Sequence, residues 1–172
     1  SLSILLLSSH RWQDFFKEKN RLAKETQQRI QQRIERMSSA EIDTGAISVI
    51  VDQYWNEFFD ETEALYKEYY QKEQEYQRKL DDIFVQGYEK ATGKSGDQIA
   101  QNLANIRDIR QQMATMQQEA HSRTRNMRDN EKAEFYAKEF DPKYNALILD
   151  IERLQKANGT IIDNQQGQGY SD

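Results

Sequence analysis

The chain has 172 residues, of which 31% are charged, with a net charge of -5 and a mean hydropathy of -1.01. This length suffices for one domain with a buried core, and the negative charge disfavours nucleic acid as a partner. The sequence has no cysteine, which excludes disulfides, thiolate chemistry and cysteine-based zinc sites. So polar a chain suits a thin, elongated helical bundle, and its regularly spaced aromatic residues argue against disorder.

The apolar stretch SLSILLL opens the chain. It is far shorter than the roughly 20 residues of a membrane-spanning helix. It also lacks the basic flank and the cleavage pattern of a signal peptide. Two interpretations stay open: the outer end of a transmembrane helix, or an added segment that packs on the domain.

The spacing predicts a first helix from His10 to about Met37. Its apolar residues share one broad face: Trp12, Phe15, Phe16, Leu22, Ala23, Ile30, Ile34 and Met37. Residues 10–37 hold eight Lys and Arg against four Asp and Glu, whereas residues 52–82 hold four against ten. A basic first helix beside an acidic second helix predicts attraction between the two.

Three arginines of this first helix are the candidate ligand-binding residues. Arg29, Arg33 and Arg36 are spaced by four and three residues, so they share one helical face. Arginines beside an apolar seam can clamp a carboxylate with paired donors. They can equally pair with the acidic second helix or extend into water, and that structural role is the commoner one.

A second, long helix is predicted from Ala46 to about Ala91, after a turn at SSAEIDTG near residues 39–45. At 1.5 Å per residue it would span roughly 70 Å. Tyr66 and Tyr70 widen its inward stripe, either as bundle packing or as part of a helix–helix or dimer contact. The stripe itself has steps of three and four residues: Ile47, Val51, Tyr54, Phe58, Leu65, Tyr69, Tyr76, Leu80, Ile83 and Phe84.

TGKSGD predicts the next turn, near residues 92–97. Gly93 suits the end of the second helix, and Ser95 or Asp97 suits the start of the third. The third helix carries Ile99, Leu103, Ile106, Met113, Met116, Ala120 and Met127. The three methionines read either as a pliable binding groove or, more simply, as core residues.

The only proline, Pro142, follows Asp141. Proline is tolerated at the first position of a helix and aspartate is a preferred cap, so a turn near residues 139–142 and a fourth helix from Pro142 are predicted. Residues 158–160, NGT, predict fraying or a kink and match a glycosylation acceptor. The expected architecture is all-α, an elongated antiparallel four-helix bundle over residues 1–165 with a flexible polar tail at 166–172.

The sequence offers no catalytic constellation. Its two histidines, His10 and His121, cannot supply the Glu-x-x-His pairs of a di-metal bundle, and His121 reads as a solvated residue. No strand is predicted, so no glycine-rich phosphate loop follows one. We therefore expect no enzyme, no metal and no cofactor.

Residues 129–158, DNEKAEFYAKEFDPKYNALILDIERLQKAN, carry a family resemblance. They resemble the junction between the third and fourth helices in four-helix-bundle sensor domains of bacterial methyl-accepting chemotaxis receptors. The apolar start before a charged first helix is similar to the end of such a receptor's first membrane span. The matching features are Asp129, Ala133, Tyr136, Pro142, Leu147, Leu154 and Asn158. The family's arginine spacing for amino-acid carboxylates is not reproduced, and Gly159 interrupts the fourth helix.

The resemblance implies a periplasmic, extracytoplasmic sensor domain of an inner-membrane receptor. Such a domain forms homodimers, binds a small molecule near the dimer seam and contacts the membrane only through spans outside residues 1–172. An anionic metabolite would suit Arg29, Arg33 and Arg36. The alternative is a helical scaffold or adaptor that binds other proteins, such as a secretion-system or envelope component.

Overall fold

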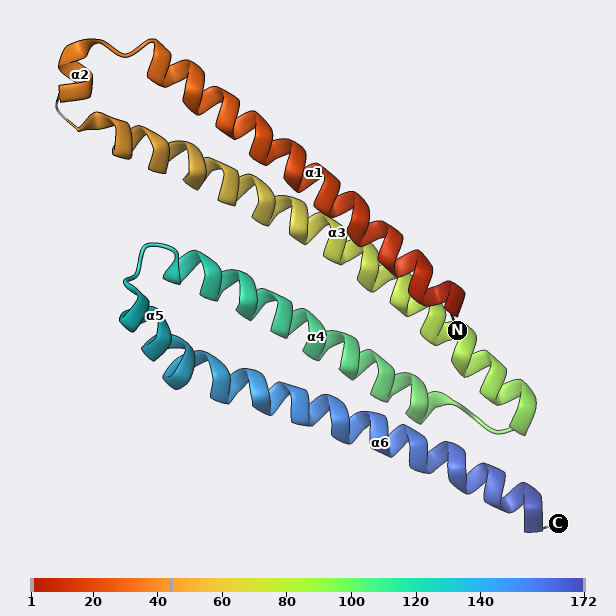
Figure 1. Cartoon of the computed structure of the whole chain (residues 1–172). Coiled ribbons are helices and arrows are strands. Elements are labelled where there is room, and N and C mark those ends of the chain that lie inside the picture. Colours follow the sequence, from red (N-terminus) through yellow and green to blue (C-terminus); the bar gives the residue numbers. More distant parts are fainter. Residues whose placement is uncertain (1, 44, 172) are drawn as a thin grey trace. The chain divides into compact units, whose positions relative to one another are not determined.

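The computed structural model describes the backbone of residues 2–43 and 45–171 and the side chains of residues 12–42 and 45–164. The described residues contain helices and no strand, so the predicted all-α class is confirmed (Figure 1). In chain order the elements are α1 (Leu2–Glu35), α2 (Ser39–Asp43), α3 (Ala46–Thr92), α4 (Asp97–Thr124), α5 (Asp129–Phe135), a π-helical turn η1 (Tyr136–Phe140) and α6 (Asp141–Ser171).

The chain divides into two compact units, Ser1–Glu73 and Gln74–Asp172, with the division inside α3. In the first unit, α2 joins α1 to the first part of α3, which runs back alongside α1. In the second unit, α4 and α6 lie side by side. The first unit is therefore a helical hairpin, the second contains the α4–α6 hairpin together with the end of α3, and each has its own buried residues.

The core of the first unit is aromatic. Phe15 of α1 is buried, and its ring centroid lies 5.9 Å from that of Tyr66 and 5.8 Å from that of Tyr69 on α3. The ring of Trp12 lies 5.5 Å from that of Tyr66. Edge-to-face and tilted ring pairs at these distances add attraction beyond the apolar area that they bury. Tyr66 and Tyr69 therefore pack between the two helices of this unit.

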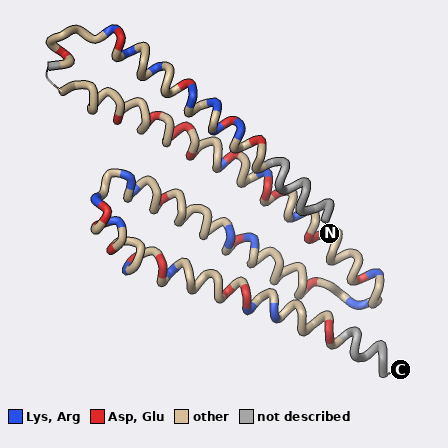
Figure 2. The backbone as a smooth tube through the Cα atoms, in the orientation of Figure 1, with Lys and Arg blue, Asp and Glu red and all other residues tan. Residues whose placement is uncertain are grey.

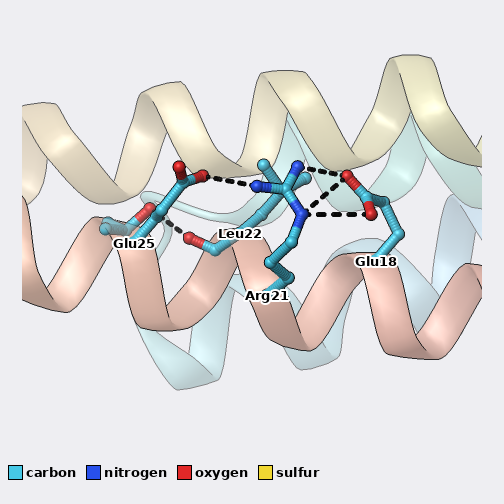
Figure 3. Close-up of polar contacts among 5 residues, drawn as sticks. Glu18, Arg21, Leu22 and Glu25 are labelled. Carbon is cyan, nitrogen blue, oxygen red and sulfur yellow. Dashed lines mark hydrogen bonds and ion pairs between the residues drawn. The ribbon is translucent and has the colours of Figure 1, made fainter.

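Charge is distributed unequally over the same unit. Figure 2 shows Lys and Arg concentrated on α1 and Asp and Glu on α3, as the residue counts predict. Many of these charges pair within one helix. Arg21, for example, donates to Glu18 one turn before it and to Glu25 one turn after it, each at 3.1 Å (Figure 3). Such pairs, three and four residues apart, help a strongly polar sequence to stay helical.

The pKa of the Glu18 carboxyl is lowered from its ordinary value, chiefly by its hydrogen bond with Arg21. A depressed folded-state pKa means that the stabilisation is present at neutral pH and is lost as the pH falls through that pKa. We expect Glu18→Gln to lower the urea midpoint slightly at about pH 7 and not at about pH 3. The control is Glu61→Gln at another exposed position. A Glu18→Gln difference that persists in acid would contradict this origin.

The second unit has a buried polar contact between α4 and α6. The Asn102 side-chain amide donates to the Asn158 side-chain oxygen at 2.8 Å, and both residues are buried. Gln98 donates to the Asn102 side-chain oxygen at 3.0 Å. Ile99 and Ile106, about one turn before and one turn after Asn102 on α4, are also buried. A paired buried amide favours one alignment of the helices, because any other would leave polar atoms without partners.

An ion pair ties the end of α3 to α4 within this unit. Arg107 donates to the carboxylate of Asp81, which is buried and also accepts from Gln77 at 3.0 Å. The Gln74 side-chain amide donates to the Arg107 backbone carbonyl at 3.0 Å. These contacts give the buried Asp81 carboxylate two donors, as a charge away from water requires.

The predicted turn near residues 92–97 is confirmed and depends on two glycines. Gly93 directly follows α3 and has a φ of +68°, a backbone conformation that residues other than glycine rarely adopt. Gly96 precedes α4 and is buried against α3. A Cβ atom at Gly96 would lie 2.7 Å from a methyl carbon of Val85. Only glycine allows the chain to pass this close to α3.

We expect Gly96→Ala to destabilise the protein by about 1–3 kcal/mol, because the added carbon forces Val85 to move. Gly87→Ala is the matched control, since Gly87 lies inside α3 with nothing within 4 Å of a Cβ atom. Replacing this helical glycine should stabilise by about 0.5–1 kcal/mol. Urea unfolding measures both. Equal shifts for the two variants would show that contact with Val85 is unimportant.

The predicted turn near residues 139–142 is wrong. The chain stays helical from η1 into α6, and Asp141 has helical dihedral angles, φ -57° and ψ -44°, instead of those of a cap. Its N–H donates to the carbonyl of Tyr136, five residues back. Pro142 has no N–H for the carbonyl four residues before it, and its ring crowds that carbonyl. A widened turn ahead of the proline accommodates both effects without breaking the helix.

The reversal falls earlier, at residues 125–128, because α4 ends at Thr124 and α5 begins at Asp129.

Two residues of the predicted inward stripe on α3 are not buried as predicted: Ile83 is 66% exposed and Phe84 is 50% exposed. Phe16 of α1 is 54% exposed. The three-residue and four-residue steps drift around a helix 47 residues long, so they do not keep one face throughout.

The fourth predicted helix continues through residues 158–160, so the expected interruption at NGT is absent from α6. Leu147, Ile151 and Leu154 are half-buried along it. The backbone is helical as far as Ser171, which includes most of the predicted tail at 166–172. The side chains of that stretch and residue 172 lie outside the described residues, and the flexibility of the tail stays a prediction.

Candidate ligand-binding site

The predicted arginines lie along one flank of the α1–α3 hairpin. Arg29 approaches Glu57 of α3 at 3.5 Å, and its guanidinium carbon lies 5.2 Å from the centre of the Tyr54 ring. This is the pairing with the acidic second helix that the sequence offered as the structural alternative. Both charged side chains are more than half exposed, so the pair is well screened by water.

Arg33 has a different partner. Its guanidinium lies 3.3 Å from the Glu41 carboxylate of α2, so it connects the end of α1 to the connecting segment. Arg36 follows α1 and is exposed. The three arginines thus share a flank but do not converge on one partner group. Their role in ligand binding stays a prediction.

An apolar groove lies on the opposite flank of the same hairpin. It has a volume of about 360 Å³ and is bordered by α1 and α3. The candidate arginines do not line it. At roughly 100° per residue, Arg29 and Arg33 point away from the α1 side chains that do. The lining residues are Gln27, Ile30, Gln31, Ile34, Glu35, Val51 and Trp55.

A second hollow lies at the head of the α4–α6 hairpin, where α4 meets the π-helical turn. Its volume is about 220 Å³, and it combines apolar with charged side chains. We call it the head hollow. Its lining residues are Met116, Glu119, Ala120 and Arg123 from α4, Phe135 from α5, Glu139 and Phe140 from η1, and Lys143 from α6.

Arg123 is the best-positioned charged group of the head hollow. Its guanidinium lies 3.1 Å from the Glu139 carboxylate and 4.9 Å from the centre of the Phe135 ring. The ring face attracts the cation, so two contacts from different elements orient the same side chain. Glu139 belongs to the widened turn, which places its carboxylate opposite the last turn of α4.

Aromatic rings in edge-to-face and stacked contact line this end of the hairpin. The rings of Tyr136 and Phe140 lie 5.1 Å apart, and those of Phe140 and Tyr144 lie 5.0 Å apart and stack. The Gln117 amide of α4 donates to the Tyr144 hydroxyl at 2.8 Å. The ladder continues from η1 into α6, so the side chains around the head hollow are held from both helices.

Other chemistry is limited in the part of the chain that the structure describes. There, three or more His, Asp or Glu side chains do not cluster in a way that could hold a metal ion. His121 is exposed on α4, as expected. Within the same residues, the helices are too short in apolar length to cross a membrane. The side chains of the SLSILLL stretch lie outside them.

Asn158 is the asparagine of the NGT triplet that matches a glycosylation acceptor. The structure buries this residue to 7% exposure, and its side-chain oxygen accepts the bond from Asn102. A glycan attached to the Asn158 side-chain nitrogen would need space that the packing of α4 against α6 fills. Asn158 is therefore part of the hairpin interior, whereas Gly159 is half-buried and Thr160 is exposed.

The chain was compared with known protein families, with curated proteins and with solved structures, and none of the three comparisons finds a match. Its function is therefore inferred from the site geometry and from the resemblance of residues 129–158.

The spacing of apolar residues in the sequence does not predict the head hollow. It extends the third helix through Met127 and places a turn at residues 139–142, which separates Arg123 from Glu139. One clue was present: aromatic residues and the lone proline concentrate in FYAKEFDPKY, residues 135–144. A proline after a helical aromatic run is compatible with a π-helical turn, and such turns are frequent at functional sites.

We expect Asn158→Ala to lower the free energy of unfolding by about 1–3 kcal/mol, because it leaves the buried Asn102 amide without its partner. Urea denaturation monitored by circular dichroism measures this. Asn145→Ala, at an exposed position of the same helix, is the control. If the two variants unfold at the same midpoint, the asparagine contact does not stabilise the hairpin.

Proposed function

We propose that this chain is the extracytoplasmic, periplasmic sensing domain of an inner-membrane signalling receptor of the chemotaxis type, and that it binds its small-molecule ligand in the head hollow. The observation that carries this proposal is the position of the head hollow: its charged and aromatic residues border the widened turn that leads directly into α6. The resemblance of residues 129–158 to receptor sensor domains supports the same function.

In this proposal the two hairpins associate as an elongated antiparallel four-helix bundle, and the protein forms homodimers. It acts without catalysis or a cofactor and does not bind nucleic acid. It contacts the membrane through spans outside residues 1–172. Arg29, Arg33 and Arg36 remain the second candidate for the ligand site.

The physical requirement for sensing is a ligand that binds two conformations of the domain unequally. In this proposal the π-helical turn is the element that changes, because it holds one residue more than a regular α-helical turn. Conversion to a regular turn would advance the following helix by about one residue, which is roughly 1.5 Å and 100° of rotation. A ligand that touches Glu139 and Phe140 is placed to bias this equilibrium.

A helical scaffold is the second candidate. Ile83 and Phe84, adjacent on α3, are 66% and 50% exposed, and exposed apolar side chains that adjoin one another are typical of protein contact surfaces. Replacement of both by serine should abolish partner binding in a scaffold and leave small-molecule binding intact in a sensor.

A thermal-shift screen of small metabolites on the whole chain tests the sensor proposal. A ligand at about 100 times its Kd stabilises by about 2.7 kcal/mol, which corresponds to a Tm increase of roughly 5–10 °C for a protein of this size. We expect Arg123→Gln to remove the shift and Arg33→Gln to retain it. Loss of the shift only in Arg33→Gln would move the site to the first helix. The absence of any stabilising metabolite would favour the scaffold.

A further inference from the structure

We infer that the head hollow takes a small monocarboxylate with an apolar body, and that the ligand replaces the Glu139 carboxylate on Arg123. This inference rests on the proposed function, because it names the ligand class for the same site. The hollow already contains a carboxylate bound to a guanidinium, because Glu139 lies 3.1 Å from Arg123.

The Arg123 side chain is prepared for such a ligand. A guanidinium presents five N–H donors in a planar fork that matches both oxygens of a carboxylate. Its contact with the Phe135 ring at 4.9 Å holds the fork in place whichever carboxylate it binds. Arg123 is therefore oriented before a ligand binds, which lowers the conformational entropy cost of binding.

Glu139 is a replaceable partner. Its side chain is 52% exposed and that of Arg123 is 62% exposed, so water can solvate each group when the pair separates. Exposed ion pairs of this kind are weak. Glu139 thus acts as a tethered competitor, which occupies the arginine in the absence of ligand and is released into solvent when a ligand binds.

The other lining residues restrict the ligand class. Lys143 adds a second positive charge on the α6 side, and Glu119 adds a negative charge on the α4 side. With Arg123 and Glu139, the lining has two positive and two negative side chains, so a monocarboxylate adds less unpaired negative charge than a dicarboxylate. Met116 and Phe140 supply apolar contact for the body of the ligand.

The volume of the head hollow restricts the size of the ligand. Pockets for drug-sized ligands have volumes of about 300–1,000 Å³. The head hollow, at about 220 Å³, is smaller than that range. Benzoate is a suitable probe, because it joins one carboxylate to a compact aromatic body that can stack on phenylalanine. Benzamide has the same shape without the charge and is the matched control ligand.

The test is isothermal titration calorimetry of the whole chain with benzoate, benzamide and succinate at constant ionic strength. We expect benzoate to bind more tightly than the other two. Arg123→Gln should weaken benzoate binding by about tenfold or more, since a charge-assisted hydrogen bond is lost. Arg110→Gln, at an exposed position of the same helix, is the control and should bind like the parent.

Glu139→Gln separates ligand competition from a structural role. Removal of the tethered competitor should tighten benzoate binding by up to about fivefold. If Glu139 instead helped to build the site, the same substitution would weaken binding. Far-UV circular dichroism and urea midpoints establish that each variant is folded, and Arg123→Lys, which keeps the charge without the fork, should bind with intermediate affinity.

Equal binding of benzoate and benzamide, or weaker binding by Glu139→Gln, would overturn the inference. The proposed function would survive that result if a ligand of another class gave a thermal shift that required Arg123. Conversely, benzoate binding that requires Arg123 would support the inference even if the chain, joined to a receptor signalling module, gave no change in output. That second result would count against the sensing function alone.

Discussion

The alignment of α4 with α6 depends on the buried hydrogen bond between Asn102 and Asn158. An apolar contact at this position would tolerate sliding by one turn, whereas a displaced asparagine pair would leave two amides without partners in the interior. Gln117 lies fifteen positions after Asn102 on α4, and Tyr144 lies fourteen positions before Asn158 on α6, so both pairs belong to one antiparallel register. The same register brings Arg123 opposite Glu139.

Much of the remaining helical structure is stabilised by ion pairs within single helices. Arg21 with its two glutamates, and Arg78 with Glu75 and Asp82, pair across one helical turn at the surface. Ion pairs between helices are fewer, and the buried contacts between helices are an aromatic cluster around Phe15 in the first unit, and the asparagine pair and the Asp81–Arg107 ion pair in the second. This division explains how a chain of such low mean hydropathy forms long helices around thin cores.

The head hollow adjoins the one irregular helical turn within the described residues. The proline that follows this turn prevents a regular hydrogen bond, and the widened backbone carries Glu139 and Phe140 toward α4. In the proposed function, the ligand site and the turn that changes therefore share the same residues. Such an arrangement would link ligand contact to the position of α6 without a long path of coupled side chains.

The sequence by itself determined the all-α class, the extent of α3 and the turn at Gly93. Each of these depends on local properties: the period of the apolar residues, the absence of β-rich segments and the conformational freedom of glycine. It also indicated the charge asymmetry that pairs Arg29 with Glu57.

The position of α5 and the continuity of η1 with α6 were decided by tertiary structure. A proline can begin a helix or interrupt one, and only the packing of the aromatic residues before it selects between these outcomes. The head hollow depends on residues 116–143 from two helices, and their meeting requires the register that Asn102 and Asn158 impose. Local periodicity holds no information about that register, because a contact between distant residues is decided by which polar groups must find partners inside the folded hairpin.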